Sequence, residues 1–106
     1  MTKKLCMLAI LLLSTHLASA QENPKDTYKP KEGYVPDAKT AIKIAVAVWE
    51  PICGAKVIAD EKPYRATLSN AVWTVEGSLS KGSVGGVALA EISKDDGKIL
   101  RAIHGK

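Results

Sequence analysis

Few residues of this chain have the chemistry that catalysis or metal binding requires. Beyond residue 20 the sequence holds one cysteine, Cys53, and one histidine, His104. Cys/His catalysis would need these two side chains to meet, although one lies at the end of an expected helix and the other near the last residue of the chain. A zinc site needs three or four ligands of the right type, and the sequence has no such cluster. Cys53 is interpreted as a small buried residue, with an intermolecular disulfide or a reactive thiol as alternatives.

The acidic residues and the glycine-rich segment also lack a catalytic pattern. The carboxylates are scattered, nothing in their spacing pairs two of them for acid–base work, and each is expected to be solvated or ion-paired: Glu50, Asp60, Glu61, Glu76 and Glu91. The segment "GSVGG" lacks the Lys-Ser/Thr that follows in a phosphate-binding loop, so a plain loop is expected there. His104 is interpreted as a structural residue packed near Ala88. We therefore expect no enzyme activity, no cofactor and no metal.

The first twenty residues have the features of a secretory leader. Lys3 and Lys4 precede an apolar run from Leu5 to Leu13, and Ala18-Ser19-Ala20 supplies a small-residue cleavage site. A membrane-spanning helix needs about 20 apolar residues, so the run is too short for a stable membrane anchor. We expect cleavage after Ala20 and a periplasmic or secreted protein.

The remaining residues are expected to form one small domain preceded by a tether. Residues 21–33, "QENPKDTYKPKEG", are polar and proline-rich, which is typical of a flexible segment. Residues 34–106 form the expected domain. The chain has a net charge of +4, but its lysines are scattered and no basic block is interleaved with aromatic residues, so nucleic-acid binding is not expected.

One helix is predicted from about Asp37 to Ile52. Pro36 and Asp37 provide a start signal, and Pro51 and Gly54 provide a stop. Apolar residues recur at helical spacing and make one face: Ala38, Ala41, Ile42, Ala45, Val48, Trp49 and Ile52. Charged residues lie on the opposite side of the helix: Lys39, Lys43 and Glu50.

Two hairpins are predicted after the helix. In "PYRATLSNAVWTVEGSL" a Ser69-Asn70 turn would pair Ala66 with Trp73 on a helix-facing side. At the end of the chain, an Asp95-Asp96-Gly97 turn would set the register of the closing hairpin. Its helix-facing pairs would be Ala88 with His104, Ala90 with Ala102, and Ile92 with Leu100.

The other side of the closing hairpin is the candidate partner-binding surface. There Leu89 would face Ile103, and Glu91 would face Arg101. Aliphatic residues surround this charged pair, and exposed patches of this kind often mark interaction sites. The candidate residues are Val87, Leu89, Glu91, Ile99, Arg101 and Ile103. Cover by another segment of the same chain is the alternative, and binding would then involve the Lys39–Lys43–Glu50 side of the helix.

Three segments resemble a known family. "GYVPDAKTAIKIAVAVWEPICG", "EKPYRATLSNAVWTVEGSL" and "GGVALAEISKDDGKILRAIHGK" are similar to bacterial immunity proteins with a nuclear transport factor 2-like fold. The resemblance covers Gly33 to Lys106. It implies a protein that binds and blocks a toxin domain. The helix followed by strands that end in "DDGKIL" is also similar to PepSY-type modules, which are exported domains linked to peptidase inhibition. A small hydrolase or ligand-binding domain is a more distant alternative.

The expected fold is therefore α+β, with one main helix packed on a four-stranded antiparallel sheet, as in a short nuclear transport factor 2-like or cystatin-like architecture. The predicted core residues are Ile42, Ala45, Trp49, Trp73, Val75, Ile92 and Leu100. The expected function is stoichiometric toxin binding outside the cytoplasm, with PepSY-like peptidase inhibition as the alternative. The sequence leaves the oligomeric state open.

Overall fold

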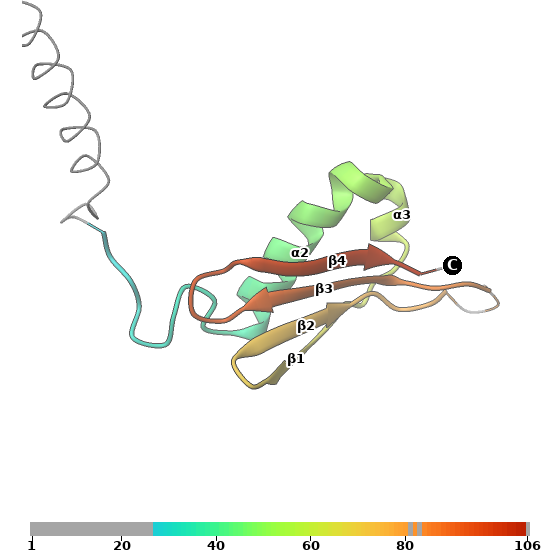
Figure 1. The fold of residues 1–106 in the computed structure, drawn as a ribbon. Coiled ribbons are helices and arrows are strands. Elements are labelled where there is room, and N and C mark those ends of the chain that lie inside the picture. The colour runs from blue at the N-terminus through green and yellow to red at the C-terminus, as the bar shows by residue number, and fades with distance from the viewer. Residues whose placement is uncertain (1–26, 81, 83, 106) are drawn as a thin grey trace, which may run out of the picture.

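The computed structural model in Figure 1 describes residues 27–80, 82 and 84–105. The leader predicted for residues 1–20 and the first part of the predicted tether lie outside this range. The described elements are α2 (Ala38–Cys53), α3 (Ala55–Ala59), β1 (Arg65–Ser69), β2 (Val72–Glu76), β3 (Ala88–Ser93) and β4 (Ile99–His104). The strands form one antiparallel sheet in the order β1-β2-β3-β4. The predicted α+β fold is confirmed.

Helix α2 has the boundaries that the sequence signals predict, within one residue. The Asp37 carboxylate accepts a hydrogen bond from the Thr40 backbone N–H at 2.8 Å, which caps the first turn. The helix continues through Pro51 to Cys53 and ends at Gly54, whose φ of 98° suits glycine. Five residues of α3 follow directly, a short helix that the sequence analysis missed.

The apolar side of α2 packs on the sheet as predicted, except in its last turn. Ala41, Ala45 and Trp49 are buried, and Ile42 is partly buried against them. Ile52 was predicted to belong to this apolar side, but it is 68% exposed. It lies in the last turn of α2, directly before α3.

The first hairpin keeps the predicted sides but not the predicted turn. Asn70 and Ala71 form the turn with φ values of 50° and 62°, so Leu68 pairs with Trp73 and Ala66 with Val75. The register thus differs from the prediction by two residues. Because side chains alternate with a period of two, this shift leaves every side chain on its predicted side.

The closing hairpin has the predicted register over four pairs and then departs from it. Leu89 pairs with Ile103 and Glu91 with Arg101, as expected. A register shift between Glu91 and Ile92 places Ile92 opposite Ile99 instead of Leu100. The prediction that Leu100 belongs to the core is therefore wrong: its side chain is 49% exposed on the edge strand.

The core lies between α2 and the three strands β1 to β3. Its buried residues are Val35, Ala41, Ala45, Trp49, Ile58, Trp73, Val75, Ala88, Ala90 and Ile92. The predicted core positions Ala45, Trp49, Trp73, Val75 and Ile92 are confirmed. None of these buried residues comes from β4, so the edge strand adds little to the core.

Candidate protein-binding surface

The structure places the six predicted partner-binding residues on one hairpin, at different levels of exposure. Val87 directly precedes β3, and Leu89 and Glu91 lie on β3; all three are half-buried. Arg101 is exposed on β4, together with Ile99 at 37% and Ile103 at 42%. Both helices lie on the other side of the sheet (Figure 1). Ile99 departs from the predicted side, because the register shift makes it the partner of Ile92, which is buried on the helix side. The described part of the chain leaves the rest of this surface open at its β4 edge.

The predicted Glu91–Arg101 pair has the expected register but not the expected ion pair. The two residues are directly opposite each other across β3 and β4. The salt bridges among the described residues involve other partners: Lys29 with Asp95, Lys56 with Asp60, and His104 with Glu61. The guanidinium of Arg101 is consequently not engaged by Glu91 and can meet an acceptor from outside the chain.

A buried carboxylate that the sequence analysis assigned to the surface holds the other end of the hairpin. Glu61 is only 8% exposed. Its Oε1 accepts a hydrogen bond from the Ala88 backbone N–H at 2.7 Å, and its Oε2 lies 2.7 Å from Nε2 of His104. Of the two alternatives predicted for Glu61, the ion pair is the one observed, but with a buried carboxylate instead of a surface one. Glu61 and His104 lie 43 positions apart in the sequence, so no local spacing pattern could reveal that they pair.

Gly77 provides the space for this carboxylate. A Cβ atom at Gly77 would lie 2.8 Å from the Cβ of Glu61 and closer still to Oε1. The Gly77 backbone N–H donates to the Ala88 carbonyl at 3.0 Å, and the Ser78 N–H donates to the Glu61 carbonyl at 2.6 Å. The segment after β2 is therefore attached both to β3 and to the Glu61 loop.

The geometry around His104 favours its charged form. Nε2 faces the Glu61 carboxylate, while Nδ1 lies 2.8 Å from the Gly105 carbonyl oxygen. Both partners are acceptors, so both ring nitrogens must donate, which only the imidazolium can do. The hydrogen bond with Glu61, and then the one with the Gly105 carbonyl, raise the pKa of His104 above its usual value of 6.5. His104 has the predicted position opposite Ala88, with a partner that was not predicted.

The stability of the domain should therefore depend on pH through His104. Because its pKa is raised in the folded state, the stabilisation is complete below the unfolded-state value of about 6.5 and is lost as pH rises through the folded-state value. Urea unfolding between about pH 5.5 and 8.5 should show this decline, and the imidazole signals in an NMR titration should report a pKa above 6.5.

Two variants provide controls for this titration. His104→Gln should remove the pH dependence in this range, since no other histidine lies beyond His16. Glu61→Gln should return the pKa of His104 toward its usual value because the carboxylate is gone. A wild-type His104 that titrates at or below 6.5 would contradict the assignment.

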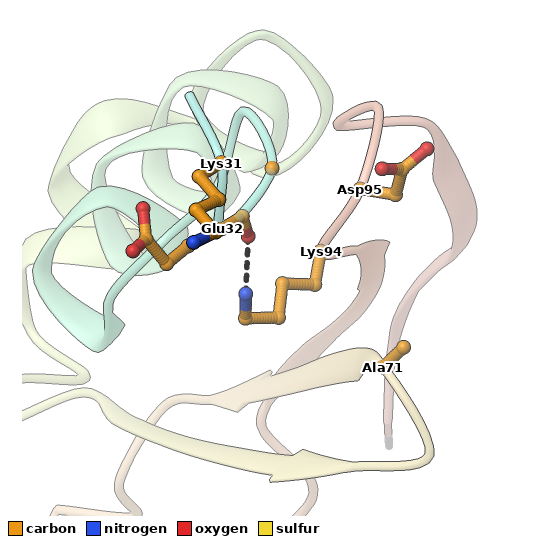
Figure 2. Close-up of a pocket in the computed structure, with 6 residues that line it drawn as sticks. Lys31, Glu32, Ala71, Lys94 and Asp95 are labelled. Atoms are coloured by element: carbon orange, nitrogen blue, oxygen red, sulfur yellow. Dashed lines mark hydrogen bonds between the residues drawn. The ribbon is translucent and has the colours of Figure 1, made fainter. Parts of the chain in front are cut away.

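Two hollows flank the domain. One, of about 260 Å³, lies beside α3 and is lined by Val57, Asp60, Glu61, Ser78, Leu79, Ser80, Val84 and Gly86. The other, of about 210 Å³, lies between the N-terminal segment and the turns of both hairpins (Figure 2). There the Lys94 side chain donates to the Glu32 carbonyl. Asp95, which also lines this hollow, forms a 2.8 Å salt bridge with Lys29. Both hollows are shallow and have mixed polar and apolar walls.

The segment before α2 is joined to the closing hairpin by backbone hydrogen bonds. Tyr34 N–H donates to the Asp95 carbonyl at 2.9 Å, and Val35 N–H donates to the Lys94 carbonyl at 3.0 Å. The indole N–H of Trp73 donates to the Val35 carbonyl at 2.8 Å. Residues 27–33, the described part of the predicted tether, thus lead into a segment that hydrogen bonds attach to the closing hairpin.

The described residues contain no group of three or more His, Cys, Asp or Glu side chains that could hold a metal ion. Cys53 is half-buried, is not part of a disulfide, and packs against the core. His104 bonds to Glu61 and Gly105, so the structure does not bring the two potential catalytic residues together in a hydrogen bond. Within the described segments, no helix is both long enough and apolar enough to cross a membrane.

Comparison with protein families identifies the chain. A family described as "NTF2 fold immunity protein" matches residues 40–106, which include most of α2 and the whole sheet. The chain belongs to this family of immunity proteins. The resemblance noted in the sequence is thereby confirmed.

This immunity protein is also similar to a curated protein of Escherichia coli (strain K12), the uncharacterized protein YhhH. The two are 37% identical over 67 residues, which is 62% of this chain and 53% of YhhH. The immunity protein thus spans about half the length of the curated relative that it matches. No solved structure matches it.

Proposed function

We propose that this immunity protein neutralises its toxin by stoichiometric contact through the closing hairpin, and that it does so outside the cytoplasm after removal of its leader. Family membership supports toxin binding, and the open aliphatic surface on β4 supports the choice of site. The same family match favours this interpretation over peptidase inhibition by a PepSY-type module.

The observation that carries the choice of surface is the exposure of β4. Half of its six residues are large aliphatic side chains between 37% and 49% exposed: Ile99, Leu100 and Ile103. Arg101 adds a cation that no described carboxylate engages. An edge strand with exposed aliphatic side chains and one uncompensated charge is suited to a protein partner that supplies apolar contacts and an acceptor.

Co-expression tests the proposal. Cells that produce the toxin domain encoded beside this gene should survive when the immunity protein is exported with its leader, and the two proteins should copurify. In vitro, toxin activity should fall linearly with added immunity protein and reach zero at a 1:1 ratio. Loss of toxin activity at far lower ratios would indicate catalytic inactivation instead, and a failure of both rescue and copurification would refute the proposal.

Export needs its own measurement. Mass spectrometry of the protein recovered outside the cytoplasm should show an N-terminus at Gln21. A chain that retains Met1 would show that the leader is not removed.

A further inference from the structure

We infer that β4 binds the toxin by strand addition, with an extended segment of the toxin hydrogen-bonded along the free edge of the sheet. The inferred segment carries aliphatic and acidic side chains. This inference rests on the proposed function and specifies how the toxin is held.

Among the described strands, β4 lies at the edge of the sheet and pairs with β3 on one side. Gly105 N–H donates to the Val87 carbonyl at 3.1 Å. Since hydrogen-bonded and non-hydrogen-bonded pairs alternate in an antiparallel ladder, Ile103 and Arg101 also direct their backbone groups to β3. The residues between them, Ala102 and His104, therefore direct their N–H and C=O groups away from the sheet.

The β3 backbone independently supports this assignment. Gly77 N–H donates to the Ala88 carbonyl, so Ala88 directs its backbone groups toward the β2 side. Its N–H is taken by Glu61. Ala88 is the partner of His104 in the register, so this pair exchanges no hydrogen bonds and the backbone groups of His104 point to the free edge.

The regular part of β4 lacks the backbone features that protect an edge strand from pairing. Edge strands are commonly protected by proline, by several charges or by bulges. β4 has no proline, and its register shift lies near its beginning, so Arg101 to His104 remain regular. The opposite edge differs, because β1 has a single large aliphatic residue, Leu68, among Arg65, Ala66, Thr67 and Ser69.

The charge of this edge selects the kind of strand that fits. Lys98, Arg101 and His104 lie on or directly before β4, which has no acidic residue. A second copy of β4 would set cations near cations, and like charges on facing strands are destabilising. His104 is already paired with Glu61, but a strand with glutamate or aspartate side chains would pair with Lys98 and Arg101, which favours an acidic segment of the toxin over self-association.

The decisive variant is Ala102→Pro, compared with Ala66→Pro. A proline at position 102 removes an N–H that points to the free edge, and it costs no hydrogen bond to β3. Ala66 is the matched position on β1: Ser69 and Val72 flank a two-residue turn and form a hydrogen-bonded pair, so the Ala66 N–H also points outward. We expect Ala102→Pro to weaken toxin binding by about thirtyfold or more, and Ala66→Pro to leave the Kd unchanged.

Two further measurements keep the inference testable if a proline variant does not fold. Leu100→Ala should weaken binding about tenfold, while Leu68→Ala, at a similarly exposed leucine on β1, should not. In hydrogen exchange of the wild-type complex, the amides of Ala102 and His104 should become protected, and those of Ala66 and Leu68 should not.

The outcomes separate this inference from the proposed function. If the wild-type protein binds and blocks the toxin, but Ala102→Pro binds equally well and the β4 amides remain unprotected, strand addition is wrong and the proposed function stands. If the wild-type protein does not bind the toxin, both fail. Light scattering that shows a dimer of the free protein, dissociated by Ala102→Pro, would assign the edge to a second copy and overturn the inference.

Discussion

Replacing Trp73 with alanine is expected to lower the free energy of unfolding by about 3–5 kcal/mol. Trp73 is 8% exposed in the centre of the sheet, next to Ile92 on β3 and Leu68 on β1. Truncation removes the apolar contacts of the ring and leaves a cavity that the surrounding sheet can fill only in part. It also leaves the buried Val35 carbonyl without the indole N–H that it accepts at 2.8 Å.

Urea unfolding of Trp73→Ala and Trp73→Phe separates these two contributions. Phenylalanine keeps most of the ring volume but has no N–H. Trp73→Phe should therefore lower the free energy of unfolding by about the contribution of the lost hydrogen bond, about 1–3 kcal/mol. The segment before α2 should be released first, since the indole holds Val35 beside the sheet. A Trp73→Ala variant that unfolds cooperatively at the wild-type urea concentration would mean that this side of β2 does not face the core.

The helix and the sides of the strands could be predicted because they depend on local spacing. Apolar residues at helical spacing selected the face of α2 that is buried, and alternation selected the buried side of β2. The Asp95-Asp96-Gly97 turn also fixed most of the closing register, in which Glu91 pairs with Arg101. In each case, neighbours in the sequence supply the physical cause.

The errors lie where distant contacts decide the structure. A turn with Ala71 at a φ of 62° is unfavourable on local grounds, but the Ala71 carbonyl accepts a hydrogen bond from the Lys94 backbone N–H at 2.9 Å, which helps to hold it. Leu100 has a suitable type for a core residue, and only its place on an uncovered edge strand leaves it exposed.

The candidate site shows the same division between features set by neighbours in the sequence and features set by distant contacts. The residues of the closing hairpin could be named from the sequence because one turn brings them together. The Glu61–His104 pair could not, because it joins the turn after α3 to the end of β4 across the fold. It holds the terminal part of β4 beside β3, and so it positions the edge strand that we assign to the toxin.

Replacing Arg101 with alanine is expected to leave the free protein nearly unchanged and to weaken the toxin complex by about 2–5 kcal/mol. Arg101 is exposed and forms no salt bridge with a described residue, so the free energy of unfolding should change by no more than about 0.5 kcal/mol. In the complex, by contrast, the toxin would cover the guanidinium. Its loss would leave a toxin carboxylate buried and unpaired, which accounts for most of the cost.

Arg65→Ala is the matched control for Arg101→Ala. Arg65 is an exposed arginine on β1, the opposite edge strand, and it also lies across the ladder from a glutamate, Glu76. Both variants lower the net charge equally, so a general loss of electrostatic attraction would affect both association rates alike. Calorimetry should show weaker toxin binding for Arg101→Ala only. Kinetic measurements should show that the loss of affinity comes mainly from faster dissociation. Equal losses for the two variants would show that the toxin senses the overall charge of the protein, and that Arg101 does not lie in the interface.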